Sequence, residues 1–175
     1  MKENTFWNDA ARYGMVLGLV AIAFLTAGYY VQHALLTWAS FLISVGLLTY
    51  FTKRRVARCA TPQTGCGYGK CLGFMVCVML FAGFIEGAFT ALAANWLFVA
   101  HYDAQLGQAI ALLDGTGFYS RDQLALAMKW MHSPLWLVVC TMLGSAAKGG
   151  FFGLFIAAFT KREPDLFSSD SNSDL

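Results

Sequence analysis

Two opposite charges, Glu86 and Lys148, are the residues of this chain best suited to do chemistry, because each interrupts a long apolar run. Glu86 is the one charged residue within 71–102, and Lys148 is the one charged residue within 133–160. An isolated charge at mid-membrane costs at least about 2.5–3.5 kcal/mol on insertion scales. Such residues are therefore expected to be paired with each other or to mark a pathway for ions or protons.

The spacing places both charges at a similar depth. Glu86 follows Cys71 by fifteen residues, and Lys148 precedes Lys161 by thirteen. At 1.5 Å per residue, these separations are about 22 Å and about 20 Å from the same end of two antiparallel helices. We therefore predict an intramembrane ion pair between Glu86 and Lys148. It either fixes the helix register or forms a proton- or ion-linked site, and the residue types leave both interpretations open.

The elements that must position these charges are membrane-spanning helices. Of the 175 residues, 58% are hydrophobic and 13% are charged, whereas soluble domains carry roughly 25% charged residues. No Asp, Glu, Lys or Arg occurs between Tyr13 and Thr52, a length sufficient for two spans of about 20 residues each. The first apolar run is too long for a cleaved signal peptide and is expected to remain as a span. We predict an all-α integral membrane four-helix bundle with helices at about 11–31, 35–51, 71–100 and 134–160.

Residues 102–132 are predicted to form two short amphipathic helices outside the membrane, between the third and fourth spans. Apolar residues recur at helical spacing in 104–113, and Ser120 and Gln123 have the spacing of a capping box. These helices are expected to lie on the outer membrane surface or against the bundle, or else to bind a partner. Residues 1–162 then form a single membrane domain, and the Ser- and Asp-rich segment 163–175 is predicted to be a disordered cytoplasmic tail.

Glycines four residues apart predict close helix packing, because small residues at this spacing let two helix backbones touch. Two of them, Gly83 and Gly87, flank Glu86, and a third, Gly149, follows Lys148 directly. The glycines expected at helix contacts are Gly14, Gly18, Gly69, Gly73, Gly83, Gly87, Gly149 and Gly153.

A basic cluster after the second span predicts the orientation of the chain. Lys53, Arg54, Arg55 and Arg58 are expected in a loop that contacts anionic lipid headgroups. The positive-inside rule places this loop and both termini in the cytoplasm, which predicts a multi-pass protein of the bacterial inner (cytoplasmic) membrane. The expected partners are membrane lipid and either further copies of the chain or another membrane protein. No folded basic domain indicates nucleic-acid binding.

Metal and catalytic chemistry have little support in the sequence. His33, His101 and His132 are all expected at the outer face and are weak candidates for a metal site, since no local i, i+4 histidine pair exists. The five cysteines contain no C-x2-C pair and are expected to be reduced and structural. No residue arrangement suited to hydrolysis is present, so we expect no cofactor and no enzymatic activity.

Four segments of the chain occur in a familiar order: Tyr13–Gly18, Gly67–Gly73, Ser133-Pro134 with the amphipathic segment before it, and Lys148–Lys161. In these segments the chain resembles an uncharacterised bacterial family of four-helix integral membrane proteins, described as domain of unknown function 4199. The resemblance covers nearly the whole chain and implies four spanning helices, but it implies no activity and no catalytic residues.

Two functions are consistent with these expectations. The first is a scaffold or accessory subunit that uses its glycine faces and its outer helices for association. The alternative is a small oligomeric transporter or channel that uses Glu86 and Lys148. Ion flux that depends on Glu86 would indicate the transporter, whereas a partner recovered by crosslinking without flux would indicate the scaffold.

Overall fold

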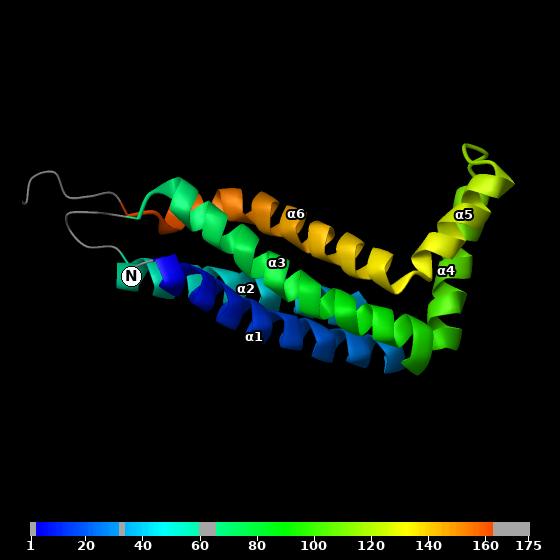
Figure 1. Ribbon diagram of the computed structural model, residues 1–175, viewed down its shortest axis with the longest axis horizontal. Coiled ribbons are helices and arrows are strands. Elements are labelled where there is room, and N and C mark those ends of the chain that lie inside the picture. The colour runs from blue at the N-terminus through cyan, green and yellow to red at the C-terminus, as the bar shows by residue number, and fades with distance from the viewer. Residues whose placement is uncertain (1–2, 32–33, 60–65, 163–175) are drawn as a thin grey trace, which may run out of the picture.

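The computed structural model describes residues 3–31, 34–59 and 66–162, and this part of the chain is helical (Figure 1). The elements are α1 (Glu3–Tyr30), α2 (Ala34–Cys59), α3 (Tyr68–Leu92), the π-helical segment η1 (Ala93–Leu97), α4 (Val99–Asp114), α5 (Arg121–Met131) and α6 (Pro134–Thr160). Among the described residues, the helical stretches long and apolar enough to cross a membrane are four: Thr5–Tyr30, Ala34–Cys59, Tyr68–Leu97 and Pro134–Thr160. The prediction of an all-α chain with four candidate spans is confirmed. The predicted tail lies outside the described residues.

The central helix of the bundle is α3. It lies between α6 and α1, and α2 lies behind them in the view of Figure 1. The contacts of α3 with α6 and with α1 are the most extensive in the fold, whereas α2 contacts mainly α1 and touches α3 and α6 much less. The bundle is therefore closely packed around α3 and loosely packed along α2.

The close packing around α3 depends on glycines, as the sequence predicts. A β-carbon built on Gly83 would lie 2.6 Å from the β-carbon of Ser145 on α6, and one built on Gly14 would lie 2.5 Å from the β-carbon of Phe81 on α3. The other glycines whose β-carbon would come within 3.0 Å of a neighbouring helix are Gly18, Gly87, Gly149 and Gly153. At five of these six positions the nearest atom is a backbone atom or a β-carbon, so a side chain would push two helices apart. At Gly153 it is the far end of the Leu72 side chain, which can move aside.

Gly69 and Gly73 differ from the other six glycines. A β-carbon on either residue would meet no atom within 4 Å among the described residues. Both lie in the first turns of α3, on a part of its surface that no other described helix covers. The structure therefore does not place these two glycines at a helix contact.

Helices α1 and α2 are longer than their apolar runs. The first begins at Glu3 instead of about residue 11, and the second continues to Cys59 instead of ending near residue 51. Basic residues are good helix formers, so the polar end of α2 continues the helix beyond its apolar stretch. The basic cluster, expected in a loop, is therefore part of α2.

The third span ends differently from the sequence prediction. A single helix was expected to Ala100, but α3 passes into the π-helical segment η1, and Phe98 then leaves helical geometry with φ −130° and ψ 37°. The side chain of Asn95 donates a hydrogen bond to the carbonyl oxygen of Ala91 over 2.9 Å. Since a π-helical turn disrupts the regular hydrogen-bond ladder, the chain can change direction here, and α4 begins at Val99.

Arg55 does not face lipid headgroups. Its side chain is 12% exposed and pairs with Asp9 of α1, with 3.3 Å between Nη1 and Oδ2. The guanidinium carbon also lies 4.7 Å from the ring centre of Phe6 and 4.4 Å from that of Phe74. Arg55 therefore joins α1, α2 and α3 inside the bundle, whereas Lys53, Arg54 and Arg58 are exposed, as headgroup contact would require.

We expect Arg55→Met to lower the free energy of unfolding by about 1–3 kcal/mol, because the half-buried carboxylate of Asp9 loses a charged hydrogen-bond partner. The adjacent residue, Arg54, is exposed, so Arg54→Met is the matched control and should change stability little. Reversible unfolding in mixed micelles, followed by circular dichroism, measures both. Equal stability of the two variants would contradict a structural role for the ion pair.

The two short helices predicted in 102–132 are present as α4 and α5. Ser120 and Gln123 form the predicted capping box, in which the backbone nitrogen of Gln123 donates to Ser120 and the backbone nitrogen of Ser120 donates to Gln123. The helices extend together away from the end of the bundle (Figure 1). No residue of α4 is buried, and Leu124 is the buried residue of α5.

Candidate functional site

A cavity of about 820 Å³ lies between α1, α2, α3 and α6, in the half of the bundle next to α4. Its lining includes both charges that the sequence analysis singled out, Glu86 and Lys148, and we refer to it as the Glu86–Lys148 cavity. Its volume falls within the range of about 300–1,000 Å³ that is typical of small-molecule sites. The loose packing of α2 against α3 and α6 leaves this space open.

Glu86 and Lys148 share the cavity without touching. Among the described residues, ion pairs shorter than 4.0 Å are Asp9–Arg55 and Asp103–His132, and the predicted Glu86–Lys148 pair is not one of them. Lys148 nevertheless lies near enough to interact electrostatically with Glu86. The sequence predicted a direct ion pair. The structure brings both residues to one cavity, but their charged groups are too far apart for that pair.

The glycine contacts between α3 and α6 hold these two charges in place. Gly83 packs on Ser145, and the backbone of Gly87 lies against Val138, where a β-carbon would be 2.9 Å from Cα of that residue. Glu86 lies between Gly83 and Gly87 in the sequence, so its side chain leaves α3 next to the contact with α6. There it lines the cavity.

Polar side chains continue the cavity lining toward α4. Six of them come from two helices: Thr37, Ser40 and Ser44 of α2, and His101, Gln105 and Gln108 of α4. The hydroxyl of Ser44 donates to the carbonyl oxygen of Ser40 over 2.8 Å, and the side chains of His101 and Gln105 approach to 3.0 Å. Besides the two charges, the cavity thus offers hydrogen-bonding groups on α2 and α4.

These polar residues were not identified as a site from the sequence. The signal that could have found them is the spacing of Thr37, Ser40 and Ser44, which repeats every three to four residues and so places all three on one face of a helix. A line of hydroxyl groups on an otherwise apolar span indicates a surface that does not face lipid.

Aromatic side chains form the remaining walls. Phe24 and Tyr29 line the cavity from α1, Phe41 from α2 and Phe152 from α6. The rings of Phe41 and Phe152 meet edge to face, with 5.1 Å between their centres. Such walls suit an apolar group, while the polar lining suits a charged or hydrogen-bonding one.

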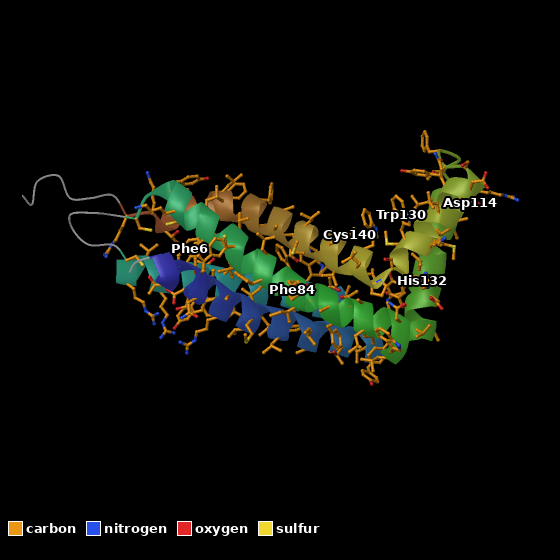
Figure 2. The ribbon with its side chains drawn as sticks, in the orientation of Figure 1. Phe6, Phe84, Asp114, Trp130, His132 and Cys140 are labelled. Atoms are coloured by element: carbon orange, nitrogen blue, oxygen red, sulfur yellow. The ribbon has the colours of Figure 1, made fainter. Side chains whose placement is uncertain are left out.

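The other half of the bundle is filled with side chains. Tyr13 stacks on Phe51 with 4.5 Å between ring centres, and Phe74, Met75 and Val78 of α3 are fully buried beside them. This core occupies the end at which α1 begins and α6 ends, where Figure 2 labels Phe6. The cavity is therefore closed toward this end of the molecule.

The histidines proposed as weak metal candidates do not form a metal site in the part of the chain that the structure describes. His101 contacts Gln105 and the ring of Tyr29, whereas His132 pairs with Asp103. No group of three His, Cys, Asp or Glu residues that could hold a metal ion occurs among the described residues. His33 lies outside them.

His132 and Asp103 join the foot of α5 to α4. Nε2 of His132 lies 2.9 Å from Oδ1 of Asp103, and Nδ1 lies 2.9 Å from the carbonyl oxygen of Met128. Figure 2 places His132 at the foot of this helix pair and Asp114 at its tip. Since both ring nitrogens face acceptor oxygens, the doubly protonated imidazolium is the form that donates to both. These hydrogen bonds, first to Met128 and then to Asp103, raise the pKa of His132.

We expect the contact between α4 and α5 to weaken as pH rises. A pKa raised in the folded state means that protonated His132 stabilises the fold below the ordinary pKa, and that this contribution is lost as pH rises through the raised value. The protection of residues 99–132 against hydrogen exchange, corrected for the intrinsic increase of exchange rates with pH, should therefore be lower at the higher pH. In Asp103→Asn, one acceptor of the imidazolium loses its charge, so the difference in hydrogen-exchange protection between low and high pH should be smaller. An unchanged profile in that variant would contradict this prediction.

Two cysteines also come together, although their spacing did not predict a site. The sulfur atoms of Cys66 and Cys71 lie 3.6 Å apart and both residues are buried. The backbone of Cys66 also exchanges two hydrogen bonds with Arg162, which ties the segment before α3 to the end of α6. The thiols lie in the closed half of the bundle, away from the Glu86–Lys148 cavity.

Comparison with known proteins adds no function. No family model, no curated protein and no solved structure matches this chain.

Proposed function

We propose that the protein is a small membrane transporter that binds a solute in the Glu86–Lys148 cavity. The observation that carries this proposal is the asymmetry of the bundle. The half next to α4 contains a cavity of about 820 Å³ with two opposite charges, and the other half is filled by the core around Phe74. A binding site that is closed toward one end and continues toward the other is the arrangement that alternating access requires.

This proposal favours the transporter over the scaffold that the sequence suggested first. A purely structural ion pair would be expected to be in contact and enclosed by packing. Instead, Glu86 is partly exposed, Lys148 is exposed, and both line one cavity with hydroxyl and amide groups. We further propose the bacterial inner membrane as the location, with both termini in the cytoplasm and α4 and α5 outside. Membership of the four-helix family that the chain resembles remains a proposal of the same kind.

The test is flux through the purified full chain in liposomes. A pH-sensitive dye inside the liposomes reports proton movement, and a potential-sensitive dye reports movement of other charges. We expect flux in the wild type that is lost in Glu86→Gln. Lys129→Gln is the matched control, because Lys129 is exposed on α5 and does not line the cavity. Wild-type liposomes as tight as protein-free ones would contradict coupled ion transport.

An accessory or scaffold role is the second candidate, and one observation favours it. A β-carbon built on Gly46 of α2 or on Gly144 of α6 would meet no atom within 4 Å among the described residues, as at Gly73. Small residues on exposed faces of spanning helices allow another helix to approach closely. Crosslinking in native membranes, with Gly144→Leu as the variant, tests this role. Loss of a specific crosslinked species in the variant would support it.

A further inference from the structure

The Glu86–Lys148 cavity carries an inference about its ligand, which rests on the proposed binding function. Glu86, which carries a carboxylate, lines the cavity from α3, and Lys148, which carries an ammonium group, lines it from α6. Within the described part of the chain, neither group forms a side-chain hydrogen bond or an ion pair shorter than 4.0 Å. Charged groups inside an apolar bundle gain most from a partner of opposite charge that also forms hydrogen bonds.

We propose that the cavity binds a zwitterion with an apolar substituent, with its cationic group at Glu86 and its anionic group at Lys148. A ligand with a single charge would satisfy one of these residues and leave the other without a partner. A zwitterion satisfies both and brings no net charge into the bundle. The hydroxyl groups of Ser40 and Ser44 lie on the same cavity wall. The hydroxyl of Ser40 can donate or accept a further hydrogen bond, and that of Ser44, which already donates to the carbonyl oxygen of Ser40, can accept one.

The apolar substituent follows from the size and the walls of the cavity. A volume of about 820 Å³ exceeds the need of the smallest zwitterions, and Phe24, Phe41 and Phe152 form apolar surface beside the charges. Burying an aromatic or branched aliphatic group against these rings adds hydrophobic stabilisation to the two charged contacts.

Two sources supply this chemistry. One is a free amino acid with a large apolar side chain, which would reach the cavity past His101 and Gln105 of α4. The other is the headgroup of an aminophospholipid such as phosphatidylethanolamine, which would enter beside the loosely packed α2. Both ligands offer an ammonium group, an anionic group and an apolar part, so separate experiments must distinguish them.

The first experiment compares phenylalanine with two analogues that each lack one charge. Phenylethylamine keeps the cation, and phenylpropionate keeps the anion. Calorimetry with the full chain in nanodiscs measures binding. We expect phenylalanine to bind at least about tenfold more tightly than either analogue, because each charged hydrogen bond contributes that much. Glu86→Gln should remove the preference over phenylpropionate, and Lys148→Met should remove the preference over phenylethylamine. Lys129→Met, outside the cavity, should keep both preferences.

The second experiment tests the lipid source. The full chain is assembled in nanodiscs with equal amounts of phosphatidylethanolamine and phosphatidylglycerol, and native mass spectrometry identifies the retained lipid. A preference for phosphatidylethanolamine that is lost in Glu86→Gln and in Lys148→Met assigns the headgroup as the ligand. A preference for phenylalanine in the first experiment, without lipid selectivity in the second, assigns the free solute.

A further variant avoids the difficulty that a change in either charge could disturb folding. Ser40→Trp narrows the cavity from α2, where packing is loose, and leaves both charges in place. We expect it to abolish binding while its unfolding curve stays close to that of the wild type. The zwitterion proposal is wrong if the analogues bind as tightly as phenylalanine, or if the wild type prefers neither phenylalanine nor phosphatidylethanolamine. Flux that persists in that case would keep the transport proposal, so the two failures are distinguishable.

Discussion

Replacing Gly83 with alanine is expected to lower the free energy of unfolding by about 1–3 kcal/mol, the usual cost of overpacking a close contact. The new β-carbon would lie 2.6 Å from the β-carbon of Ser145 and 2.9 Å from the α-carbon of Met142. Because the second of these atoms belongs to the backbone of α6, no rotation of a side chain relieves the overlap. The two helices must separate, and since they make the most extensive contact in the fold, the change should extend along both.

The matched control is Gly73→Ala on the same helix. A β-carbon there meets no described atom within 4 Å, and alanine is more favourable than glycine inside a helix by up to about 1 kcal/mol. This variant should therefore be as stable as the wild type or slightly more stable. Unfolding in mixed micelles, followed by circular dichroism, compares the two variants. If both lose the same stability, the contact between α3 and α6 at Gly83 is not as close as the structure shows.

This pair of variants also shows what glycine spacing can predict. Gly69 with Gly73 and Gly83 with Gly87 have the same four-residue pattern, and nothing in the pattern distinguishes one pair from the other. The rotation of α3 about its axis, which the whole bundle determines, turns the second pair toward α6. The pattern therefore predicts that a helix can pack closely, whereas the neighbouring helices determine where it does so.

The helix boundaries illustrate a similar difference. The start of α6 was predicted correctly at Pro134, because proline suits the first position of a helix. The end of α3 was not, because η1 and Phe98 lie in an apolar stretch without glycine or proline. A change of direction that arises from a π-helical turn leaves little trace in composition. The basic residues after Thr52 likewise continue α2, since nothing in them stops a helix.

The candidate site was predictable in its charges but not in its shape. Counting residues from the same end of two antiparallel helices placed Glu86 and Lys148 at similar depth, and the structure brings both to one cavity. The cavity itself depends on how far α2 stands from α3 and α6, which is a property of tertiary packing. For that reason the sequence suggested a direct pair, whereas the structure leaves space between the two side chains.

Removing both charges is expected to separate their contribution to stability from their contribution to transport. Glu86→Leu or Lys148→Leu alone leaves the opposite charge in the bundle without a counter-charge, and each should destabilise the fold. The double variant contains neither charge, so it should be more stable than the sum of the single changes predicts. Unfolding of the four proteins in one detergent gives the coupling energy directly.

The size of this coupling follows from the separation of the charges. Two unit charges 4 Å apart interact by about 4 kcal/mol at an effective dielectric constant of about 20. Because Glu86 and Lys148 form no ion pair within 4.0 Å, we expect a smaller coupling of about 0.5–3 kcal/mol. A coupling near zero would mean that the two charges do not interact in the folded protein.

Flux in the same four proteins completes the experiment. If the cavity binds a transported solute through both charges, flux should be lost in either single variant and should stay lost in the double variant, even though the double variant regains stability. The stability measurement thus serves as the control for folding, because a well-folded protein without flux has lost a functional group. Should the double variant transport as well as the wild type, the two charges would serve only to position α3 against α6.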